Sequence, residues 1–424
     1  MDLPVHLKTK LGRYRLISFF ISLLLSTILF YSCGASSRGL KHGVWRATLK
    51  TVSGAEIPFN FSVVDTAGKK IIYLMNAGER FRVDDVVQQQ DSVIIKLPLF
   101  DSEIRAQLTS EGMSGKWTRH LPDKSIDMDF NAEPGVSWRF FKPGEKADVD
   151  VSGRWSATFI SPDGKDTTIA VGEFTQDSSH VTGTFLTTTG DYRYLEGAVS
   201  RDKLFLSTFD GSHAFLFTGT VRNHTIVDGK FYAGLSSVDN WTANKDARAM
   251  LPDAYSLTTL KKGYDKISFS FPDLQGKTVS LSDQRFRNKV VVVQFLGSWC
   301  PNCMDETAFL APFYKKYRTK GVEIIGLAYE RTSDLERSRK SIEQLQKRFD
   351  VAYPLLITGF TNKEALKSMP ALNEFKAFPT TIIIDKKGKV RKIHTGFSGP
   401  GTGSHYTEFV NEFEKLIDTL VKEP

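Results

Sequence analysis

The stretch that decides the fold of this chain runs from Val290 to Cys303 and reads VVVVQFLGSWCPNC. Its apolar first half is typical of a buried strand, and after a short turn a Cys-x-x-Cys pair opens a helix. A cysteine at a helix N-terminus lies among backbone N–H groups that have no partner, and these groups and the helix dipole favour the thiolate. A second cysteine one turn further on can close a small disulfide. The spacing therefore predicts a reversible redox pair at Cys300 and Cys303.

A zinc site is the alternative interpretation of the same spacing, because Cys-x-x-Cys supplies half of the four ligands that structural zinc needs. The chain has only three cysteines, and no His-x-His or His-x3-His pair accompanies this one. We therefore predict a redox site with no metal and no cofactor.

Length and composition describe a folded protein of several domains. At 424 residues the chain exceeds one ordinary hydrophobic core, so two or three domains are expected. Hydrophobic residues make up 41% and charged residues 25% of the chain, which excludes a disordered polypeptide. The formal charge is +8, but no run of Lys and Arg is interleaved with aromatic residues. We therefore expect no nucleic-acid partner.

The N-terminus has the pattern of an export signal. Four basic residues precede an apolar segment over residues 16–31, which is short for a membrane span and typical of a signal peptide. The segment ends in Tyr31-Ser32-Cys33-Gly34, which resembles a bacterial lipoprotein cleavage site with Cys33 as the lipidated first residue. An uncleaved anchor and an ordinary signal peptide are the alternatives. We predict a signal over residues 1–33 and a membrane-anchored protein of the bacterial cell envelope that faces the periplasm.

Residues 40–246 read as antiparallel β-structure. Short runs of alternating apolar and polar residues are separated by turn residues such as Asp163-Gly164, and no stretch shows helical periodicity. The region is also duplicated, because Gly43-Val44-Trp45 recurs 110 positions later as Gly153-Arg154-Trp155. A second match pairs Gly115-Lys116-Trp117 with Gly229-Lys230-Phe231.

The duplication predicts two β-rich repeats, at residues 40–148 and 149–246, each a meander that forms a barrel or a sandwich. Two tandem barrels and one double-sized structure with a shared interface are both compatible with the pattern. The aromatic residues that we expect in the core are Trp45, Trp117, Trp155 and Phe231. The region is either a spacer that holds the redox domain away from a membrane or a module that docks a ligand or a protein.

Residues 247–263 are the predicted linker, and the periodicity changes after it. Buried strands at 289–295 and 323–328 alternate with helices at 334–349 and 362–375. A strand at 380–385, a second antiparallel strand and a final helix close the chain. The sequence thus predicts a multidomain chain, with an all-β region followed by an α/β thioredoxin-like domain at residues 264–424.

The C-terminal domain resembles the TlpA/ResA branch of the thioredoxin superfamily, which is related to the AhpC/TSA-type redoxins. The matching parts are Asp273–Lys277, Phe295–Cys303 and Phe378–Thr381. The resemblance implies a thiol–disulfide oxidoreductase that acts on protein thiols and disulfides as a reductase. It also implies an electron donor in the membrane upstream of this protein.

The resemblance assigns a role to each matched residue. Cys300 would be the exposed nucleophile, and Cys303 the recessed resolving thiol that attacks Cys300 and releases the product. Pro379 would be a cis-proline that faces the cysteines, the alternative being an ordinary proline at a strand start. The backbone of Phe378 would pair with an extended substrate, and Trp299 would form part of the contact surface.

Proton transfer is implied for Glu306, three residues after Cys303. Its alternative is an ordinary solvated carboxylate on the helix surface. The buried acid that thioredoxins carry six residues before the first cysteine is Gln294 here. Because an amide cannot act as a base, proton transfer would fall to Glu306 or to water.

Two further functions compete with the oxidoreductase. A thiol peroxidase is the first, although peroxiredoxin-type sites carry Thr or Ser where this chain has Gly297, three residues before Cys300. A ligand- or protein-binding lipoprotein with an accessory redox domain is the second.

Overall fold

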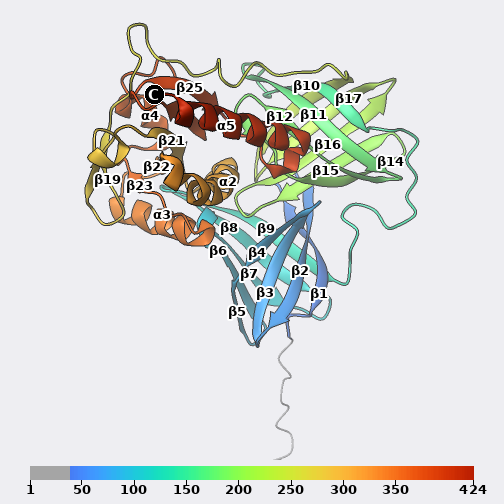
Figure 1. Ribbon diagram of the computed structural model, residues 1–424. Coiled ribbons are helices and arrows are strands. Elements are labelled where there is room, and N and C mark those ends of the chain that lie inside the picture. The colour runs from blue at the N-terminus through green and yellow to red at the C-terminus, as the bar shows by residue number, and fades with distance from the viewer. Residues whose placement is uncertain (1–38) are drawn as a thin grey trace, which may run out of the picture. The chain divides into compact units, whose positions relative to one another are not determined.

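Two nine-stranded antiparallel sheets precede the redox domain in the computed structural model, which describes residues 39–424 (Figure 1). Residues 40–424 belong to one compact unit. The predicted signal segment and Cys33 lie outside the described residues. Within residues 39–424, no helix is both long enough and apolar enough to cross a membrane.

The first sheet is a meander whose neighbours in sequence are neighbours in space. Its order is β4-β3-β2-β1-β9-β8-β7-β6-β5, so the ladder between β1 and β9 brings the two ends of the segment together. The described ladders do not join β4 to β5, and the sheet is open there. The strands are β1 Gly43–Lys50, β2 Glu56–Thr66, β3 Lys69–Asn76, β4 Glu79–Val83, β5 Asp85–Gln89, β6 Ser92–Leu97, β7 Ser102–Leu108, β8 Met113–His120 and β9 Ser125–Pro134, with a 3-10 turn η2 at Pro98–Phe100.

The second sheet repeats this plan and closes. Its order is β11-β10-β18-β17-β16-β15-β14-β12-β13, and an additional ladder between β11 and β12 completes a barrel. Closure leaves the barrel strands without unpaired edges. The strands are β10 Gly153–Ile160, β11 Thr167–Asp177, β12 His180–Thr187, β13 Gly190–Asp191, β14 Leu195–Ser200, β15 Lys203–Phe209, β16 Ala214–Arg222, β17 Thr225–Ala233 and β18 Ser237–Lys245.

The predicted duplication is confirmed, down to single contacts. The indole N–H of Trp45 donates to the carbonyl of Lys41 at 2.9 Å, and that of Trp155 donates to the carbonyl of Val151 at 2.8 Å. Each tryptophan therefore contacts the residue four positions before it. The four aromatic residues expected in the core are buried, namely Trp45, Trp117, Trp155 and Phe231.

The two sheets are separate in their hydrogen bonding but share an interface. Phe209, at the end of β15, is fully buried between rings of the first sheet. Its ring centroid lies 4.3 Å from that of Phe59 and 5.4 Å from that of Trp117. The Ser102 hydroxyl donates to the carbonyl of Gly211 at 2.6 Å. The second sheet therefore contributes a side chain to the core of the first.

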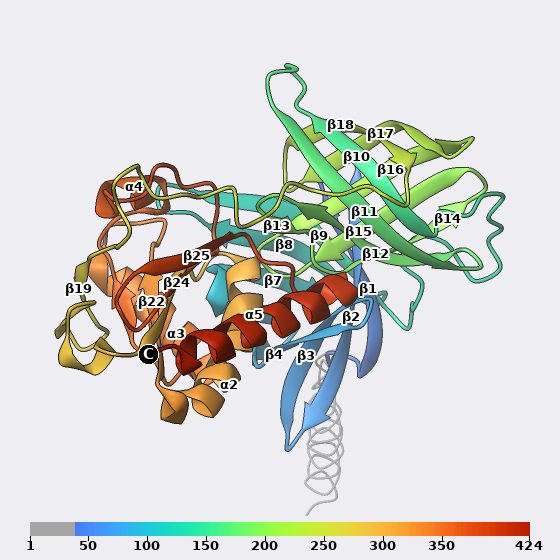
Figure 2. The same cartoon turned by 45° about the horizontal axis from the view of Figure 1, so that its top comes forward.

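The redox domain is a five-stranded sheet in the order β23-β22-β21-β24-β25, with helices packed on it (Figure 2). The first three strands are parallel, and the last two pair antiparallel, as the α/β thioredoxin-like prediction requires. The strands are β21 Val290–Leu296, β22 Val322–Ala328, β23 Leu355–Ile357, β24 Thr380–Ile384 and β25 Val390–Thr395, preceded by the hairpin β19 Ser270–Pro272 and β20 Thr278–Ser280. The helices are α2 Pro301–Tyr317, α3 Leu335–Phe349, α4 Ala365–Ser368 and α5 Ser404–Lys422.

Strand β21 lies at the centre of the sheet and is buried on both faces. Val290 and Val292 join a core cluster with residues of α2, α3 and α5, while Val291 and Val293 pack on the opposite side. This alternation follows from the two-residue period of a strand. The uninterrupted valine run is thus explained by helices on one face and the hairpin and α4 region on the other.

Candidate active site

Helix α2 begins at the redox pair. Cys300 is its N-cap residue and Pro301 occupies the first turn, where a missing N–H costs nothing. The backbone N–H of Cys303 donates to the Cys300 sulfur at 3.2 Å. Such a bond stabilises a negative charge on that sulfur. Cys303 is fully buried, and burial, together with the contact to Cys300, raises the pKa of its thiol well above the usual value.

Cys300 is not exposed, and this prediction is wrong. Only 6% of the residue is accessible. Its sulfur faces the Phe378 carbonyl at 3.7 Å, and Ser212 and Arg193 of the second sheet contact the backbone on either side of it. Both cysteines are free thiols in this structure. The reactive pair is therefore enclosed.

The peptide bond between Phe378 and Pro379 is cis, which excludes an ordinary trans proline at this strand start. Pro379 directly precedes β24. The Phe378 ring lies edge-on to the Trp299 ring, with centroids 5.6 Å apart. The structure thus brings Trp299, Cys300, Phe378 and Pro379 together at one end of the sheet.

Glu306 lies beneath this group, inside the domain. It is 1% exposed, so the alternative of a solvated helix carboxylate is wrong. One carboxylate oxygen accepts from the Gln294 amide at 2.9 Å and the other from the Thr381 hydroxyl at 2.6 Å. Burial raises its pKa to about 7, against these two hydrogen bonds. Tyr353 donates in turn to the oxygen of Gln294 at 3.1 Å and so orients the amide.

A second buried carboxylate, Glu330, holds the turn before Cys300 and was not anticipated from the sequence. It accepts from the Ser298 backbone N–H at 2.8 Å and from the Ser298 hydroxyl at 2.7 Å. The next residue, Arg331, lies over the Trp299 ring at 4.8 Å. Glu330 directly follows the tyrosine after β22, and the carboxyl end of a parallel strand is where functional side chains gather. The position of Glu330 just after a buried strand was therefore the sequence signal from which its role could have been inferred.

The second sheet supplies further residues to the start of α2. Arg193 is 7% exposed and forms ion pairs with Asp305 of α2, at 3.2 Å, and with Glu79 of the first sheet. Burial raises the pKa of Asp305 to about 7, while Arg193 opposes that shift. The Asn302 amide, between the two cysteines, donates to the carbonyls of Asp191 and Phe397 at 3.2 Å each. No local sequence pattern indicated these contacts, because they join residues more than 90 positions apart.

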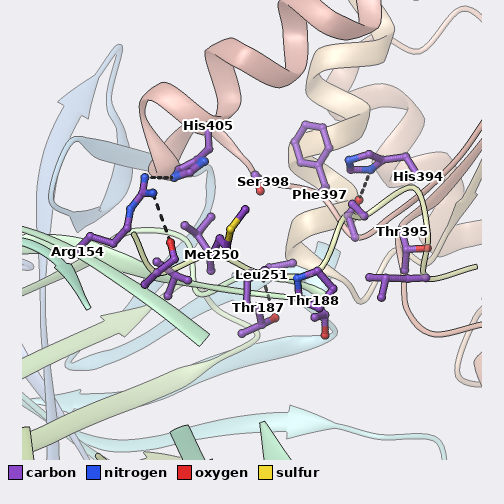
Figure 3. Close-up of a pocket in the computed structure, with 18 residues that line it drawn as sticks. Arg154, Thr187, Thr188, Met250, Leu251, His394, Thr395, Phe397, Ser398 and His405 are labelled. Carbon is purple, nitrogen blue, oxygen red and sulfur yellow. Dashed lines mark hydrogen bonds between the residues drawn. The ribbon is translucent and has the colours of Figure 1, made fainter. Parts of the chain in front are cut away.

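A cavity of about 350 Å³ lies next to this junction (Figure 3). Its walls come from the second sheet, the linker, β25 with the segment after it, and the start of α5, and they include Arg154, Met250, Leu251, His394, Phe397 and His405. The polar groups are engaged with one another, since Arg154 is paired with Glu173 at 2.7 Å and approaches His405 at 3.4 Å. Neither cysteine lines this cavity.

Across residues 39–424, no three His, Cys, Asp or Glu side chains are grouped so that they could hold a metal ion.

Comparisons with known proteins match the C-terminal domain. The Redoxin family model matches residues 261–409. The thiol-disulfide oxidoreductase ResA of Bacillus subtilis is 29% identical over 138 residues, which are 32% of this chain and 69% of that protein. The ResA of Geobacillus thermodenitrificans is 30% identical over 141 residues, or 33% of this chain and 72% of that protein. The matches to two other ResA proteins cover 66% of the length of those proteins.

Among solved structures, the thioredoxin domain of a thiol-disulfide oxidoreductase from Bacteroides vulgatus is 26% identical. That match covers 36% of this chain and all of the other chain, with a TM-score of 0.27.

Proposed function

The chain belongs to the ResA-like family of thioredoxin-type thiol–disulfide oxidoreductases, and we propose that its Cys300–Cys303 pair reduces disulfides of exported proteins. The observation that carries the proposal is the position of Cys300 as N-cap of α2, with the Cys303 N–H bonded to its sulfur. The nucleophile in thiol–disulfide exchange is a thiolate sulfur, and here the Cys300 sulfur accepts a hydrogen bond from the first turn of the helix.

The exchange has two steps. The Cys300 thiolate attacks one sulfur of a client disulfide, which forms a mixed disulfide and releases the other client sulfur as a thiolate. The Cys303 thiolate then attacks the Cys300 sulfur, releases the second client thiolate and leaves a Cys300–Cys303 disulfide. Two electrons have passed to the client, so a thiol donor upstream must reduce the pair again. We propose that this donor is a membrane protein.

Glu306 is the proposed proton acceptor for the second step. A carboxyl with a pKa of about 7 can take a proton near neutral pH, and its charge acts on the Cys303 thiol. We propose that the Phe378 backbone pairs with an extended client segment beside Pro379, and that Trp299 forms part of the same surface. The edge-on contact of the Trp299 and Phe378 rings supports a shared role.

Export and membrane tethering are part of the proposal. They rest on the signal-like segment over residues 16–31 and on Cys33 as the lipidated residue. Under this proposal the protein acts in the bacterial cell envelope, where disulfides form and persist. Growth with a labelled fatty acid, followed by purification, would test the anchor: the label is expected in the natural chain and absent from Cys33→Ser.

A trapping experiment tests the reaction. In Cys303→Ser, Cys300 can attack a client disulfide, but no second cysteine is present to resolve the mixed disulfide. The mixed disulfide is therefore expected to accumulate, and a thiol reductant should release the client from it. Cys300→Ser should form no adduct and should not reduce insulin. Cys33→Ser serves as the control that removes the third cysteine. Insulin reduction by Cys300→Ser at the natural rate would contradict the proposal.

A thiol peroxidase is disfavoured by the turn before Cys300. A Cβ at Gly297 would lie 2.2 Å from the indole nitrogen of Trp299, so a Thr or Ser cannot occupy this position without displacing the ring. We expect hydrogen peroxide to be consumed only slowly. Peroxide turnover as fast as disulfide reduction would restore this alternative.

A further inference from the structure

Two loops of the second sheet lie directly on the turn that carries Cys300. They are residues 190–193, which contain β13, and residues 210–213, between β15 and β16; we call them the covering loops. They contact the backbone on both sides of the nucleophile. The Ser212 hydroxyl donates to the Trp299 carbonyl at 3.5 Å, just before Cys300. Arg193 donates to the Pro301 carbonyl at 3.5 Å, just after it.

The fit between the covering loops and the redox domain is close enough to exclude a side chain. A Cβ at Gly190 would lie 2.4 Å from the Asn302 amide nitrogen, and one at Gly396 would lie 2.9 Å from the Thr189 backbone. The Gly190 backbone therefore packs directly on the Asn302 side chain, and the Gly396 backbone packs on that of Thr189 and Gly190. Any approach to Cys300 across this side is closed in the structure.

Two ion pairs and a hydrogen bond join the covering loop at residues 190–193 to three other parts of the chain. Arg193 pairs with Asp305 of α2 and with Glu79 of the first sheet, and it is almost completely buried. The Asp191 carboxylate accepts from the Gly399 backbone N–H at 2.7 Å and also from the backbone N–H of Arg193. Removing one partner from a buried ion pair leaves an uncompensated charge, which makes Arg193 the vulnerable point of this contact.

The opposite side of Cys300 is different. The Phe378 backbone faces the sulfur there, and Phe378 and Trp299 are both partly exposed. A single extended segment could lie along this edge, because it needs only the width of one strand. A folded surface would meet the covering loops first.

We propose that the covering loops, held by Arg193, are the specificity determinant of the redox site: they restrict Cys300 to slender, extended disulfide segments and reject folded surfaces. This inference rests on the proposed function, since it assumes that Cys300 is the attacking thiol. It gives the β-rich region a direct part in client selection. Arg193 is a positioning residue in this scheme, because it acts through the loops and not on the reacting sulfur.

Size-selective labelling tests the inference without any need for turnover. In the full chain with Cys303→Ser, Cys300 is labelled with N-ethylmaleimide or with a maleimide fixed by a short linker to the surface of a small folded protein, and the loss of the unmodified Cys300 peptide is followed by mass spectrometry. The same reactive group is thereby offered in a small and a bulky form. The measured quantity is the ratio of the labelling rate with the small reagent to that with the bulky reagent. We expect this ratio to be about tenfold or more higher for Cys300 in the protein than for a free cysteine peptide, because the bulky reagent reacts only when the site opens.

Arg193→Ala is expected to remove most of this difference in the ratio while changing the N-ethylmaleimide rate little. Asp305→Asn removes the other partner of the same ion pair, on α2, and is the second variant, should Arg193→Ala fail to fold. Arg201→Ala is the matched control, because Arg201 lies in the turn between β14 and β15 with an exposed side chain, and among residues 39–424 its ion pair is with Asp148, at 3.8 Å. With Cys303 intact, Arg193→Ala should raise kcat/KM for a folded disulfide protein and leave that for a short disulfide peptide unchanged.

Two results would overturn the inference. One is a ratio of the two labelling rates that is the same for Cys300 in the protein with unchanged loops as for a free cysteine peptide. The other is a ratio that does not change in Arg193→Ala or in Asp305→Asn. Failure of the proposed function looks different, because Cys300 would then label normally with the small reagent but form no mixed disulfide with any client.

Discussion

Glu306 is a carboxyl placed where it has no basic partner among the described contacts. It is bonded to Gln294 and Thr381, both neutral, and its pKa is raised to about 7 by burial. Position alone, three residues after Cys303, indicated the residue but not its environment. Burial was not predictable because it depends on Thr381 and Tyr353, which arrive from β24 and from the segment before β23.

The first prediction concerns the pH dependence of stability. The folded state holds the Glu306 proton up to about pH 7, whereas the unfolded chain loses it near 4.5, so the free energy of unfolding falls as pH rises between these values. The contribution amounts to about 3 kcal/mol over this window. Glu306→Gln, which does not titrate, should flatten the slope when urea midpoints are measured from pH 5 to pH 8. Glu336→Gln, at an exposed position on α3, is the control, and an equal slope in all three proteins would refute the assignment.

The second prediction concerns Glu330. Glu330→Ala leaves the buried N–H and hydroxyl of Ser298 without their acceptor, which should cost about 2–4 kcal/mol of unfolding free energy. Glu330→Gln keeps one acceptor oxygen and should cost less. Because this contact orients the turn before Cys300, trapping of a client by Cys300 should also slow in Glu330→Ala. The exposed Glu336→Ala should change neither quantity, and a Glu330→Ala protein as stable as that control would exclude the role.

At the scale of elements, the repeated Gly-Lys-aromatic motif of β8 and β17 has a steric origin. A Cβ at Gly115 would lie 2.0 Å from the Arg105 carbonyl oxygen, and one at Gly229 would lie 2.3 Å from that of Trp241. Neighbouring strands approach so closely at these points that only glycine fits. The sequence match between the two repeats therefore reports the same constraint twice.

The third prediction tests that constraint. Gly115→Ala and Gly229→Ala should each lower the free energy of unfolding by about 2 kcal/mol or more, because the clash is with backbone and cannot be relieved by a rotamer change. Gly78→Ala is the control, since a Cβ there has open space and the expected change is within about 0.5 kcal/mol. Chemical denaturation of the three variants measures the difference. Equal stabilities would mean that the strands relax easily.

Local elements were predictable where the signal was local. The valine run predicted β21, and the Cys-x-x-Cys turn predicted the start of α2. Both predictions succeeded because burial of a strand on two faces and capping of a helix depend on residues that are adjacent in sequence. The helix expected over residues 362–375 is much shorter, since η5 Asn362–Glu364 and α4 end at Ser368. Met369 precedes Pro370, and the residue before a proline is disfavoured in the α region. The backbone of Met369, with φ −132° and ψ 75°, lies outside the α region, in agreement with this cause.

At the scale of the whole molecule, the sequence predicted the order of an all-β region and a thioredoxin-like domain but not their contact. The enclosure of Cys300 arises from pairs such as Asp191 with Asn302 and Ser212 with Trp299, which are 111 and 87 positions apart. Hydrophobic periodicity reports which face of an element is buried but not by which partner. These contacts between the second sheet and the redox domain argue against the interpretation of residues 40–246 as a mere spacer.

The last prediction concerns the integrity of this assembly. One cluster of buried apolar side chains includes residues of the first sheet, Phe209 of the second sheet and residues of α2 and α5. The linker is also bound to the redox domain, because Thr395 donates from its backbone to Ala254 at 3.1 Å and from its hydroxyl to Thr258 at 2.7 Å. Buried apolar contacts do not weaken with added salt, unlike surface ion pairs. A protease site inserted between the exposed residues Pro252 and Asp253 should therefore be cut without separating the halves.

After cleavage, the two fragments are expected to co-elute from a size-exclusion column at both low and high salt, and Cys300 should keep its slow reaction with the bulky maleimide. The uncut insertion protein is the control for any effect of the added residues. Fragments that separate at high salt alone would mean that ionic contacts such as Arg193 with Asp305 carry the interface. Separation at low salt, with equal labelling of Cys300 by both reagents, would mean that the β-rich region does not govern access to the redox pair.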